Sequence, residues 1–396
     1  MKNICVVGQG YVGLPLSLKI AEAGFSVVGI DVNADLVRNL NEGKSHIEDI
    51  SDSQLADLVN SKKYYATDDF SVVSTASTIL VCVPTPLSKN HLPDVSFLLS
   101  SITSIAKFLT EDSLVIIEST IEPGTTRDVI HPLLKKESGG KIDFKLAFSP
   151  ERIDPRNQFW NLENTPKLVS GISEPSLIAA ENFYRTFIKD IHVCRSLEVA
   201  ETAKLLENTF RFINISFINE FAIFCQKAAI DVNEVIQAAA TKPYGFMAFY
   251  PGIGVGGHCI PVDPIYLMAK ARNIEAPTSF IELADSVNSQ MPHYYINIAE
   301  KMLGGLKEKK VLVIGIAYKP NVSDVRESAA IKLIDGLIEA GSEVFWHDEL
   351  VRVWNNQHSV DITGDYDLAI LTTPHDYLDL SLLGDTPILN TSKFML

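Results

Sequence analysis

Short apolar runs alternate with helical patterns along the first half of the chain. A strand buried in a parallel sheet reads as a short continuous apolar run, whereas a helix reads with a period near 3.6 residues. The predicted strands are residues 3–7, 25–30, 78–83, 114–118 and 145–148. The predicted helices among them are residues 14–23 and 95–109. This alternation indicates an open parallel sheet covered by helices.

The middle of the chain is helical. The longest pattern begins at Leu197 and runs to about Ile230, which at 1.5 Å per residue is roughly 50 Å. An apolar stripe recurs along it every three or four residues: Phe210, Ile213, Phe217, Phe221 and Phe224. On so long a helix this stripe predicts a core or a subunit interface, and we expect a homodimer or a higher homo-oligomer. Further helices are predicted over residues 232–240, 264–272 and 278–304.

The last part of the chain repeats the strand and helix rhythm. Strands are predicted at residues 311–315, 343–346, 368–371 and 388–389, with a helix at 331–340. The sequence therefore predicts an α/β fold: two doubly wound Rossmann-like parallel-sheet domains joined by a central helical region with one long helix. The predicted division is residues 1–195, 196–305 and 306–396.

Composition narrows the function classes. The net charge of −15 argues against a nucleic-acid-binding protein, which needs a basic face. The five cysteines are an odd number without C-x-x-C spacing, so we expect neither a disulfide framework nor a metal site, and a reducing compartment is indicated. No stretch approaches the ~18–20 apolar residues of a membrane span. We expect a soluble cytoplasmic protein without membrane insertion.

A glycine-rich turn follows the first predicted strand. The motif G-Q-G-Y-V-G (residues 8–13) lies between that strand and the first helix, and Asp31 ends the second strand. Such glycines let the backbone approach a pyrophosphate, and the helix N-terminus supplies partial positive charge. Asp31 would accept hydrogen bonds from a ribose 2′-OH and repel a 2′-phosphate, which favours NAD over NADP. The alternative is a doubly wound domain whose glycine turn binds no cofactor.

Polar residues follow three other strands of the same predicted sheet. Thr85, Thr120 and Glu151 each lie at or just past a strand end. Ligands of open parallel sheets bind at the carboxyl ends of the strands. Each residue alone could be a cap or a loop residue, but together they predict a ligand-binding edge.

A second glycine-rich stretch, Y-P-G-I-G-V-G-G-H-C-I-P-V-D-P (residues 250–264), can be neither a regular helix nor a strand. Cys259 in this loop, with Asp263 four residues later, is a candidate nucleophile. The alternative is a tight structural turn with an incidental cysteine. Lys204 and Asn208, at positions i and i+4 of the long helix, project from one face. Lys204 could also be an ordinary surface lysine.

Seven motifs taken together resemble the UDP-glucose/GDP-mannose dehydrogenase family over essentially the whole chain. They are G-Q-G-Y-V-G-L-P, V-P-T-P, E-S-T-I-E-P-G-T-T, S-P-E-R, E-x-x-K-x-x-x-N, G-x-G-V-G-G-H-C-x-x-x-D and K-P-N-V-S-D-V-R-E-S. The resemblance implies an NAD-binding domain, a central dimerisation region and a domain that binds a nucleotide-sugar. It also implies oxidation of a sugar C6 alcohol to a carboxylate with two NAD molecules. Within the family, S-P-E-R-I-D-P and T-K-P-Y-G-F look most like the bacterial enzymes that act on UDP-N-acetylglucosamine. UDP-N-acetylmannosamine and UDP-glucose enzymes are the alternatives.

The resemblance also implies roles for single residues. Cys259 would attack the C6 aldehyde, Lys204 and Asn208 would stabilise the oxygen, and Asp263 would position water. Glu151 and Thr120 would take part in proton transfer. The implied cofactor-binding residues are Gly8, Gly10, Tyr11, Val12, Gly13, Asp31, Val83, Pro84, Thr85, Ser119, Thr120 and Arg326. The implied substrate-binding residues are Glu151, Arg152, Lys204, Asn208, Tyr250, Gly252, Gly256, Tyr318 and Lys319.

Two departures from the family pattern stand out. Asn390 and Lys393 occupy the region after the last strand where relatives commonly have an aspartate and an arginine, and Arg156 stands where relatives often have glycine. Two other function classes stay open. One is a protein that binds NAD and a nucleotide-sugar without turnover, and the other is a two-electron dehydrogenase, which would not need Cys259.

Overall fold

The structure is a computed structural model, and it describes residues 3–47, 49–140, 142–152 and 159–392. Contacts divide the chain into two compact units, each described by itself below. The first unit is Met1–Leu206 with Ile265–Ile274, and the second is Glu207–Pro264 with Glu275–Leu396. The predicted three-part division stays a prediction. Arg156 and Lys393 lie outside the described residues.

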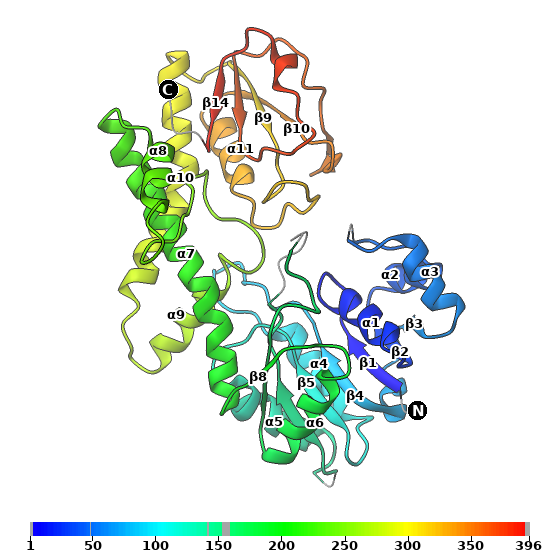
Figure 1. The fold of residues 1–396 in the computed structure, drawn as a ribbon. Helices are drawn as coiled ribbons and strands as arrows, with labels where there is room; N and C mark the ends of the chain where they lie inside the picture. Colours follow the sequence, from blue (N-terminus) through cyan, green and yellow to red (C-terminus); the bar gives the residue numbers. More distant parts are fainter. Residues whose placement is uncertain (1–2, 48, 141, 153–158, 393–396) are drawn as a thin grey trace. The chain divides into compact units, whose positions relative to one another are not determined.

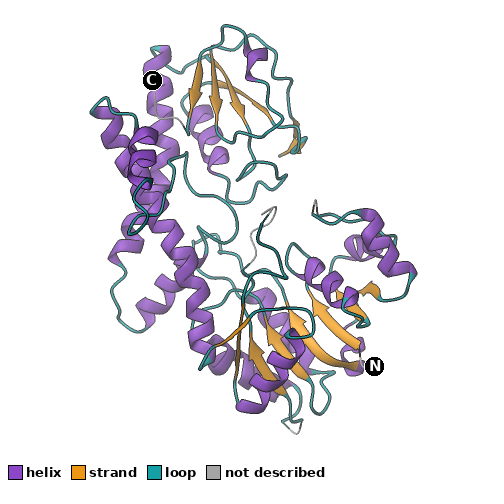
Figure 2. Cartoon of the chain, in the orientation of Figure 1, coloured by secondary structure: helices purple, strands orange, loops and turns teal. Residues whose placement is uncertain are grey.

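The first unit contains an eight-stranded sheet with the order β3-β2-β1-β4-β5-β6-β7-β8 (Figures 1 and 2). The first six strands are parallel neighbours. They are β1 (Asn3–Val7), β2 (Val27–Ile30), β3 (Tyr64–Thr67), β4 (Ala76–Val81), β5 (Leu114–Ile117) and β6 (Lys145–Phe148). The strand order reverses direction between β1 and β4, the position where doubly wound sheets bind ligands.

Helices cover both faces of this sheet because successive strand residues point to opposite sides. Ile4 and Val6 pack with α1 (Gly13–Glu22) and α6 (Glu174–Tyr184), whereas Cys5 and Val7 pack with α4 (Ser96–Ala106) and α5 (His131–Glu137). The remaining elements are α2 (Ala34–Asn41), α3 (Asp52–Asn60), η1 (Phe70–Thr75) and η2 (Thr126–Ile130). The predicted doubly wound architecture of the first domain is confirmed.

The sheet ends in a reversed pair that the strand pattern does not predict. β7 (Lys167–Gly171) runs antiparallel to β6, and β8 (Ile191–Val193) runs parallel to β7. The register pairs Phe148 with Ser170, so the start of β7 lies at the edge where the parallel strands end. Residues from the start of β7 therefore reach the ligand edge of the sheet.

The second unit combines helices with a smaller parallel sheet in the order β10-β9-β13-β14. These strands are β9 (Lys310–Ile314), β10 (Glu343–His347), β13 (Leu368–Leu371) and β14 (Ile388–Asn390). Val311 and Val313 pack in one core with α10 (Ser279–Leu303) and α11 (Ala329–Glu339). Leu312 and Ile314 pack on the other face, near η3 (Leu380–Leu383). A short hairpin adds β11 (Val353–Trp354) and β12 (Gln357–His358).

The long helix is α7 (Leu197–Lys227), which is followed by α8 (Val232–Ala240), and α9 (Asp263–Asn273) comes after the glycine-rich loop. The predicted apolar stripe of α7 divides in the structure. Phe221 packs against the core of the second unit, whereas Phe217 and Phe224 are about 60% exposed. The buried face of α7 is instead partly polar, with Thr209, Ser216 and Asn219. Among the described residues, no helix is long and apolar enough to cross a membrane.

Candidate active site

The three glycines of the first turn serve different purposes. A Cβ on Gly8 would lie 2.7 Å from the Cys82 carbonyl oxygen, and one on Gly13 would lie 1.7 Å from the Gly8 carbonyl oxygen. Close packing of strand and helix therefore requires both. A Cβ on Gly10 would meet nothing within 4 Å. Gly10 thus leaves open space beside the backbone, which is what a closely bound pyrophosphate needs.

The start of α1 also fits an anion. Its N-cap residue, Val12, makes no side-chain capping hydrogen bond, so the first-turn N–H groups are not used by a side-chain cap. Asp31 ends β2, and its two carboxylate oxygens accept hydrogen bonds from the backbone N–H groups of Gln9 (2.9 Å) and Asn33 (3.0 Å). Asp31 therefore holds the glycine turn while remaining only partly buried. These residues fit NAD.

Gln9, which the motif leaves unspecified, is fully buried under this turn. Its amide donates to the Val6 carbonyl oxygen (2.8 Å) and accepts from the Tyr64 hydroxyl (2.9 Å). Gln9 therefore joins the turn to β1 and β3. The sequence signal for it is a polar residue between the first two glycines of the turn, Gly8 and Gly10.

The loops after β4 and β5 hold one another. The Ser119 hydroxyl donates to the Val83 carbonyl oxygen (2.7 Å), and the Tyr266 hydroxyl of α9 donates to the Thr85 carbonyl oxygen (3.1 Å). Pro84 lies between these two anchored residues. The predicted cofactor-binding residues of both loops are thus fixed at the carboxyl end of the sheet.

Glu201 anchors the Thr120 loop to α7. One carboxylate oxygen accepts from the Gly124 N–H (2.5 Å), and the other accepts from the Thr126 N–H (3.0 Å). Burial raises the pKa of Glu201, and these hydrogen bonds oppose that effect. Lys204, which is 8% exposed, lies one turn farther along the helix. Sequence reasoning placed Glu201 in the E-x-x-K-x-x-x-N motif but gave it no role.

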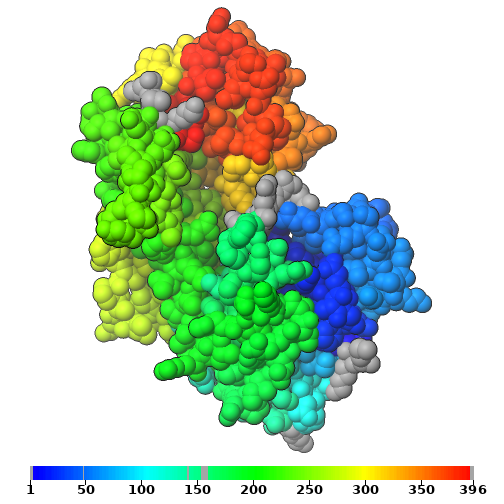
Figure 3. Space-filling model, viewed as in Figure 1, coloured from blue at the N-terminus to red at the C-terminus, as the bar shows by residue number. Residues whose placement is uncertain are grey.

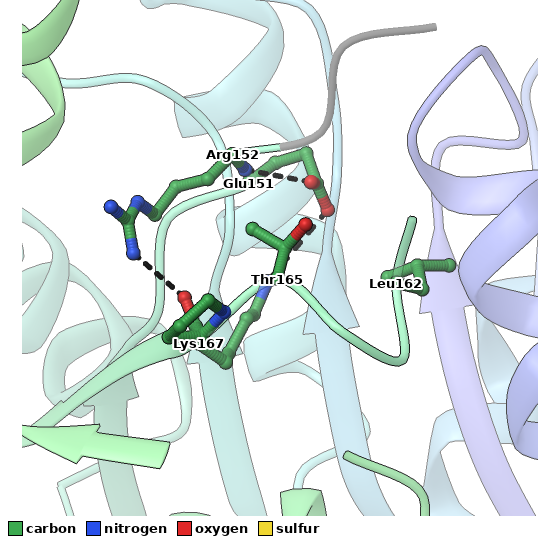
Figure 4. A pocket seen from close by; sticks show the side chains of 6 residues that line it. Glu151, Arg152, Leu162, Thr165 and Lys167 are labelled. Atoms are coloured by element: carbon green, nitrogen blue, oxygen red, sulfur yellow. Dashed lines mark hydrogen bonds and ion pairs between the residues drawn. The ribbon is translucent and has the colours of Figure 1, made fainter. Parts of the chain in front are cut away.

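Glu151 lies just past β6 and lines a small pocket with Arg152, Leu162, Thr165, Pro166 and Lys167 (Figure 4). One of its carboxylate oxygens accepts from the Arg152 N–H (2.7 Å), and the other lies 3.7 Å from the Lys167 Nζ. The Arg152 guanidinium turns away and donates to the Pro166 carbonyl oxygen (2.7 Å). Glu151 is therefore at the predicted edge, and Lys167 is a partner that the strand pattern did not predict.

The second unit brings three predicted catalytic residues together. The Asn208 amide donates to an Asp263 carboxylate oxygen (2.6 Å), and the Asp263 N–H donates to the Cys259 carbonyl oxygen (2.9 Å). Asp263 is 1% exposed, whereas Cys259 is partly exposed and forms no disulfide. A partly exposed thiol is accessible to a substrate carbon, and the backbone hydrogen bond places Cys259 one helical turn from the paired Asp263 and Asn208.

The glycine-rich loop is held by its own protein neighbours. The Gly252 N–H donates to the Asn219 side chain (2.8 Å), and the Val255 N–H donates to the Asn288 side chain (2.6 Å). The loop amides at these two positions therefore already have acceptors. Asn219 and Asn288 come from helices far away in sequence, and no local pattern identifies them.

Tyr318 explains two of the loop glycines. A Cβ on Gly256 or Gly257 would lie within 3 Å of the Tyr318 side chain. The Gly257 N–H also donates to the Arg326 carbonyl oxygen (3.1 Å). The two glycines thus let the loop pack against the segment after β9. Predicted substrate contacts at Gly252, Gly256, Tyr318 and the half-exposed Tyr250 stay predictions.

Arg326 forms an ion pair with Asp324, in which the Arg326 Nη2 lies 2.6 Å from the Asp324 Oδ2. The pKa of Asp324 is lowered: burial acts in the opposite direction but is outweighed by the Arg326 hydrogen bonds. The Lys319 ammonium lies 5.8 Å from the Tyr318 ring centroid. The predicted approach of Arg326 to the cofactor stays a prediction. Among the described residues, no group of three His, Cys, Asp or Glu side chains could hold a metal ion.

Three family models match successive parts of this chain. They describe the NAD-binding domain (residues 2–188), the central domain (198–290) and the UDP-binding domain (312–386) of the UDP-glucose/GDP-mannose dehydrogenase family. The chain belongs to this family. The expected resemblance is confirmed, NAD is the cofactor, and the protein is an NAD-dependent UDP-sugar dehydrogenase.

Curated relatives and solved structures agree with this assignment. The chain is 35% identical over 380 residues to the UDP-N-acetyl-D-mannosamine dehydrogenase of Pyrococcus horikoshii, covering 94% of this chain and 89% of the relative. It is 34% identical over 389 residues to the UDP-N-acetyl-D-glucosamine 6-dehydrogenase of Pseudomonas aeruginosa, a match that covers 94% of this chain and 90% of the relative. The solved structure of the UDP-D-ManNAc dehydrogenase from Pyrococcus horikoshii matches with a TM-score of 0.91 at 32% identity, over 100% of this chain and 96% of that one.

Proposed function

We propose that this enzyme oxidises the C6 hydroxyl of a UDP-N-acetylhexosamine to a carboxylate through a covalent intermediate on Cys259. The observation that carries the proposal is the cluster of Cys259, Asp263 and Asn208 in a chain with both NAD-binding and UDP-binding domains. A dehydrogenase that stops at the aldehyde has no need of a thiol, whereas oxidation to the acid does.

In the proposed reaction, NAD accepts a hydride from C6 in each of two oxidations. The Cys259 thiolate adds to the C6 aldehyde formed first and gives a thiohemiacetal. Oxidation of that adduct leaves a thioester, and water then hydrolyses the thioester to the carboxylate and regenerates the thiol. Holding the aldehyde on Cys259 also prevents its escape.

The other predicted catalytic side chains suit the charges that develop. Lys204 and Asn208 would stabilise the C6 oxygen as it gains negative charge. Asp263, already hydrogen-bonded to Asn208, would orient the water that attacks the thioester. Glu151 and Thr120 would move the proton of the C6 hydroxyl, directly or through water.

UDP-N-acetylglucosamine is the proposed sugar nucleotide, supported by the motifs S-P-E-R-I-D-P and T-K-P-Y-G-F and by the Pseudomonas aeruginosa relative. UDP-N-acetylmannosamine is the second candidate, because the Pyrococcus horikoshii relative carries that name. Initial rates of NADH formation with these two substrates and with UDP-glucose would discriminate among them. The proposal also requires two NADH per UDP-sugar consumed.

The covalent step is tested with two variants. Cys259→Ala should bind NAD normally and form no uronic acid. Asp263→Asn should retain the nucleophile and slow hydrolysis, so that intact-protein mass spectrometry shows a UDP-uronyl adduct. Cys225→Ala, which alters a buried cysteine in the same unit, is the matched control and should keep full activity. Uronic acid formation by Cys259→Ala at the wild-type rate would refute the covalent mechanism.

We also propose that the enzyme is a homodimer through the exposed face of α7. Phe210, Phe217 and Phe224 are 45%, 61% and 58% exposed, and the green α7–α8 part lies at the surface of the second unit (Figure 3). Contiguous apolar surface of this kind marks protein interfaces. Phe217→Asp should weaken the dimer roughly 30-fold, or about 2 kcal/mol, in sedimentation equilibrium. Ile338→Asp on α11, equally exposed, is the control, and a wild-type monomer at micromolar concentration would contradict the proposal.

A further inference from the structure

A buried charged cluster lies behind Glu151. The Lys167 Nζ is 2.5 Å from one Glu118 carboxylate oxygen, and the Tyr184 hydroxyl donates to the other. Lys167, Glu118 and Tyr184 are each less than 5% exposed. Lysine and glutamate are almost never this buried, and desolvating such an ion pair costs several kcal/mol per ion.

The reversed strand β7 brings Lys167 to this place. Pairing of Phe148 with Ser170 continues through a hydrogen bond from the Ser149 hydroxyl to the Leu168 carbonyl oxygen (2.7 Å). Extended by the same register, the two strands place Glu151 opposite Lys167. In an all-parallel sheet the first residue of a strand would lie at the other edge, away from the ligand.

Lys167 therefore stands between two carboxylates. Its Nζ contacts Glu118 at 2.5 Å and Glu151 at 3.7 Å. Burial acts to lower the pKa of Lys167, but the two carboxylates outweigh it and the pKa is raised, so the side chain is a cation at neutral pH. Other titratable groups around the cluster include Tyr184, Cys82, Lys204 and the Arg152 guanidinium, and burial raises the pKa values of Tyr184 and Cys82 far above neutrality.

We propose that Lys167 is a positioning residue for Glu151: its ammonium group, 3.7 Å from the Glu151 carboxylate, holds that carboxylate at the ligand edge, while Glu118, 2.5 Å from the same ammonium group, holds Lys167 in place. This inference rests on the proposed role of Glu151 in moving the C6 proton. Glu118 and Glu151 share one cation, so removal of Lys167 and removal of Glu118 act on Glu151 in opposite directions. A merely structural cluster would not produce that opposition.

The test follows the Glu151 carboxyl directly. The full-length protein is labelled with ¹³C-glutamate, the Glu151 signal is assigned by its loss in Glu151→Gln, and its titration midpoint is measured. Lys167→Met should move the midpoint up by about one to three pH units, the usual effect of one opposite charge at this distance. Glu118→Gln should leave it unmoved or lower. Lys167→Arg should restore the wild-type midpoint.

Two further comparisons keep the proposal testable if Lys167→Met does not fold. In Glu118→Gln, Lys167 keeps Glu151 as its partner, and in Glu118→Gln/Lys167→Met the buried Glu118–Lys167 ion pair is replaced by two neutral side chains. The Glu151 carboxyl of the double variant should titrate about one to three pH units above that of the single one. Tyr184→Phe removes a donor to Glu118 without touching Glu151, and should lower the melting temperature but not move the midpoint. Equal Glu151 titration midpoints in Glu118→Gln and in Glu118→Gln/Lys167→Met would overturn the inference. So would an upward shift of that midpoint in both Lys167→Met and Glu118→Gln.

Turnover provides the second measurement. Lys167→Met should lower kcat at neutral pH by up to about threefold with little change in KM for the UDP-sugar, and raising the pH should recover part of the loss. If the wild-type enzyme forms no NADH with any UDP-sugar, the proposed function fails. The carboxyl titration still decides in that case whether Lys167 controls Glu151.

Discussion

The two larger sheets of this protein have the same arrangement of a glycine and an aspartate at the carboxyl ends of their parallel strands, but the surroundings of the aspartate differ. In each sheet a glycine with positive φ follows the first strand: Gly8 (φ +89°) after β1 and Gly315 (φ +81°) after β9. Each approaches the chain after a neighbouring strand, because a Cβ would lie 2.7 Å from the Cys82 carbonyl oxygen or 2.2 Å from that of Thr373. An aspartate directly follows one strand of each sheet, Asp31 after β2 in the first sheet and Asp348 after β10 in the second.

The aspartates show where the two edges diverge. Asp31 is partly exposed and accepts two backbone N–H groups. Asp348 is fully buried and accepts hydrogen bonds from four backbone N–H groups, those of Ile316, Ala317, Leu350 and Val351. The His375 Nε2 lies 3.2 Å from one of its carboxylate oxygens. The backbone at the first edge has open space beside Gly10, whereas at the second edge Asp348 is paired with the buried side chain of His375.

This difference indicates two ways of binding a nucleotide. At the first edge the backbone itself is available to the pyrophosphate of NAD. At the second edge the Asp348–His375 pair fixes the loop after β9, because His375 Nδ1 accepts the Asn321 N–H at 2.9 Å. That loop carries Tyr318 and Lys319, the predicted substrate-binding residues of this edge.

The largest expected effect is on Asp348. Asp348→Ala should lower the free energy of unfolding of the second unit by about 3–5 kcal/mol, since four amides and a buried histidine lose their partner. Asp31→Ala should lower that of the first unit by about 1 kcal/mol or less, because Asp31 accepts only two backbone N–H groups and is itself partly exposed. Urea denaturation of both variants is the measurement. Equal stability of the two would remove the distinction between the edges.

The next largest effects are expected from alanine substitutions of Gly315 and Gly10, on stability and on NAD binding respectively. Gly315→Ala should destabilise the protein by about 1–3 kcal/mol or more, because the methyl group meets a backbone oxygen and the φ angle is unfavourable. Gly10→Ala should retain wild-type stability and bind NAD roughly tenfold more weakly, a loss of about 1.4 kcal/mol. Calorimetric NAD titration and thermal unfolding separate the two outcomes. Unchanged NAD affinity in Gly10→Ala would show that the open space is not the pyrophosphate site.

Cofactor choice gives a smaller effect. Asp31→Ala should narrow the preference for NAD over NADP roughly tenfold, because the carboxylate no longer repels a 2′-phosphate. The ratio of kcat/KM values for the two cofactors measures it. Wild-type enzyme that uses both cofactors equally well would contradict this role of Asp31.

The smallest effect concerns pH. Burial opposes ionisation of Asp348, but the hydrogen bonds from His375 and backbone amides outweigh it, so its pKa lies below the ordinary value of 3.8. The resulting stabilisation is complete above that value and is lost as the pH falls through the lower, folded-state pKa. The stability difference between wild type and Asp348→Asn should therefore shrink below about pH 4. A difference that is constant from pH 7 to pH 3 would exclude this linkage.

Much of this protein follows from short-range sequence pattern. The strands β1, β4, β5, β6 and β9 and the helices α7, α8 and α10 begin and end within a few residues of their predicted positions, because periodicity and caps are local properties. The same holds for the glycine turn with Asp31 and for the family motifs that contain Cys259 and Asp263. The pairing of Asn208 with Asp263 places two of those motif residues in direct contact.

Other features depend on contacts that no local pattern specifies. The reversal of β7 puts Lys167 beside Glu151, and only the packed sheet determines that strand direction. Gly256 and Gly257 are required by Tyr318, which lies some sixty residues later in the chain. The stripe on α7 reads as uniformly apolar in sequence, yet the core covers Phe221 and leaves Phe217 exposed. The sequence by itself determined most of the elements and the cofactor motif, and it identified Cys259 as the predicted nucleophile. The tertiary structure decided which charges and side chains meet, because burial and register arise only when distant segments pack together.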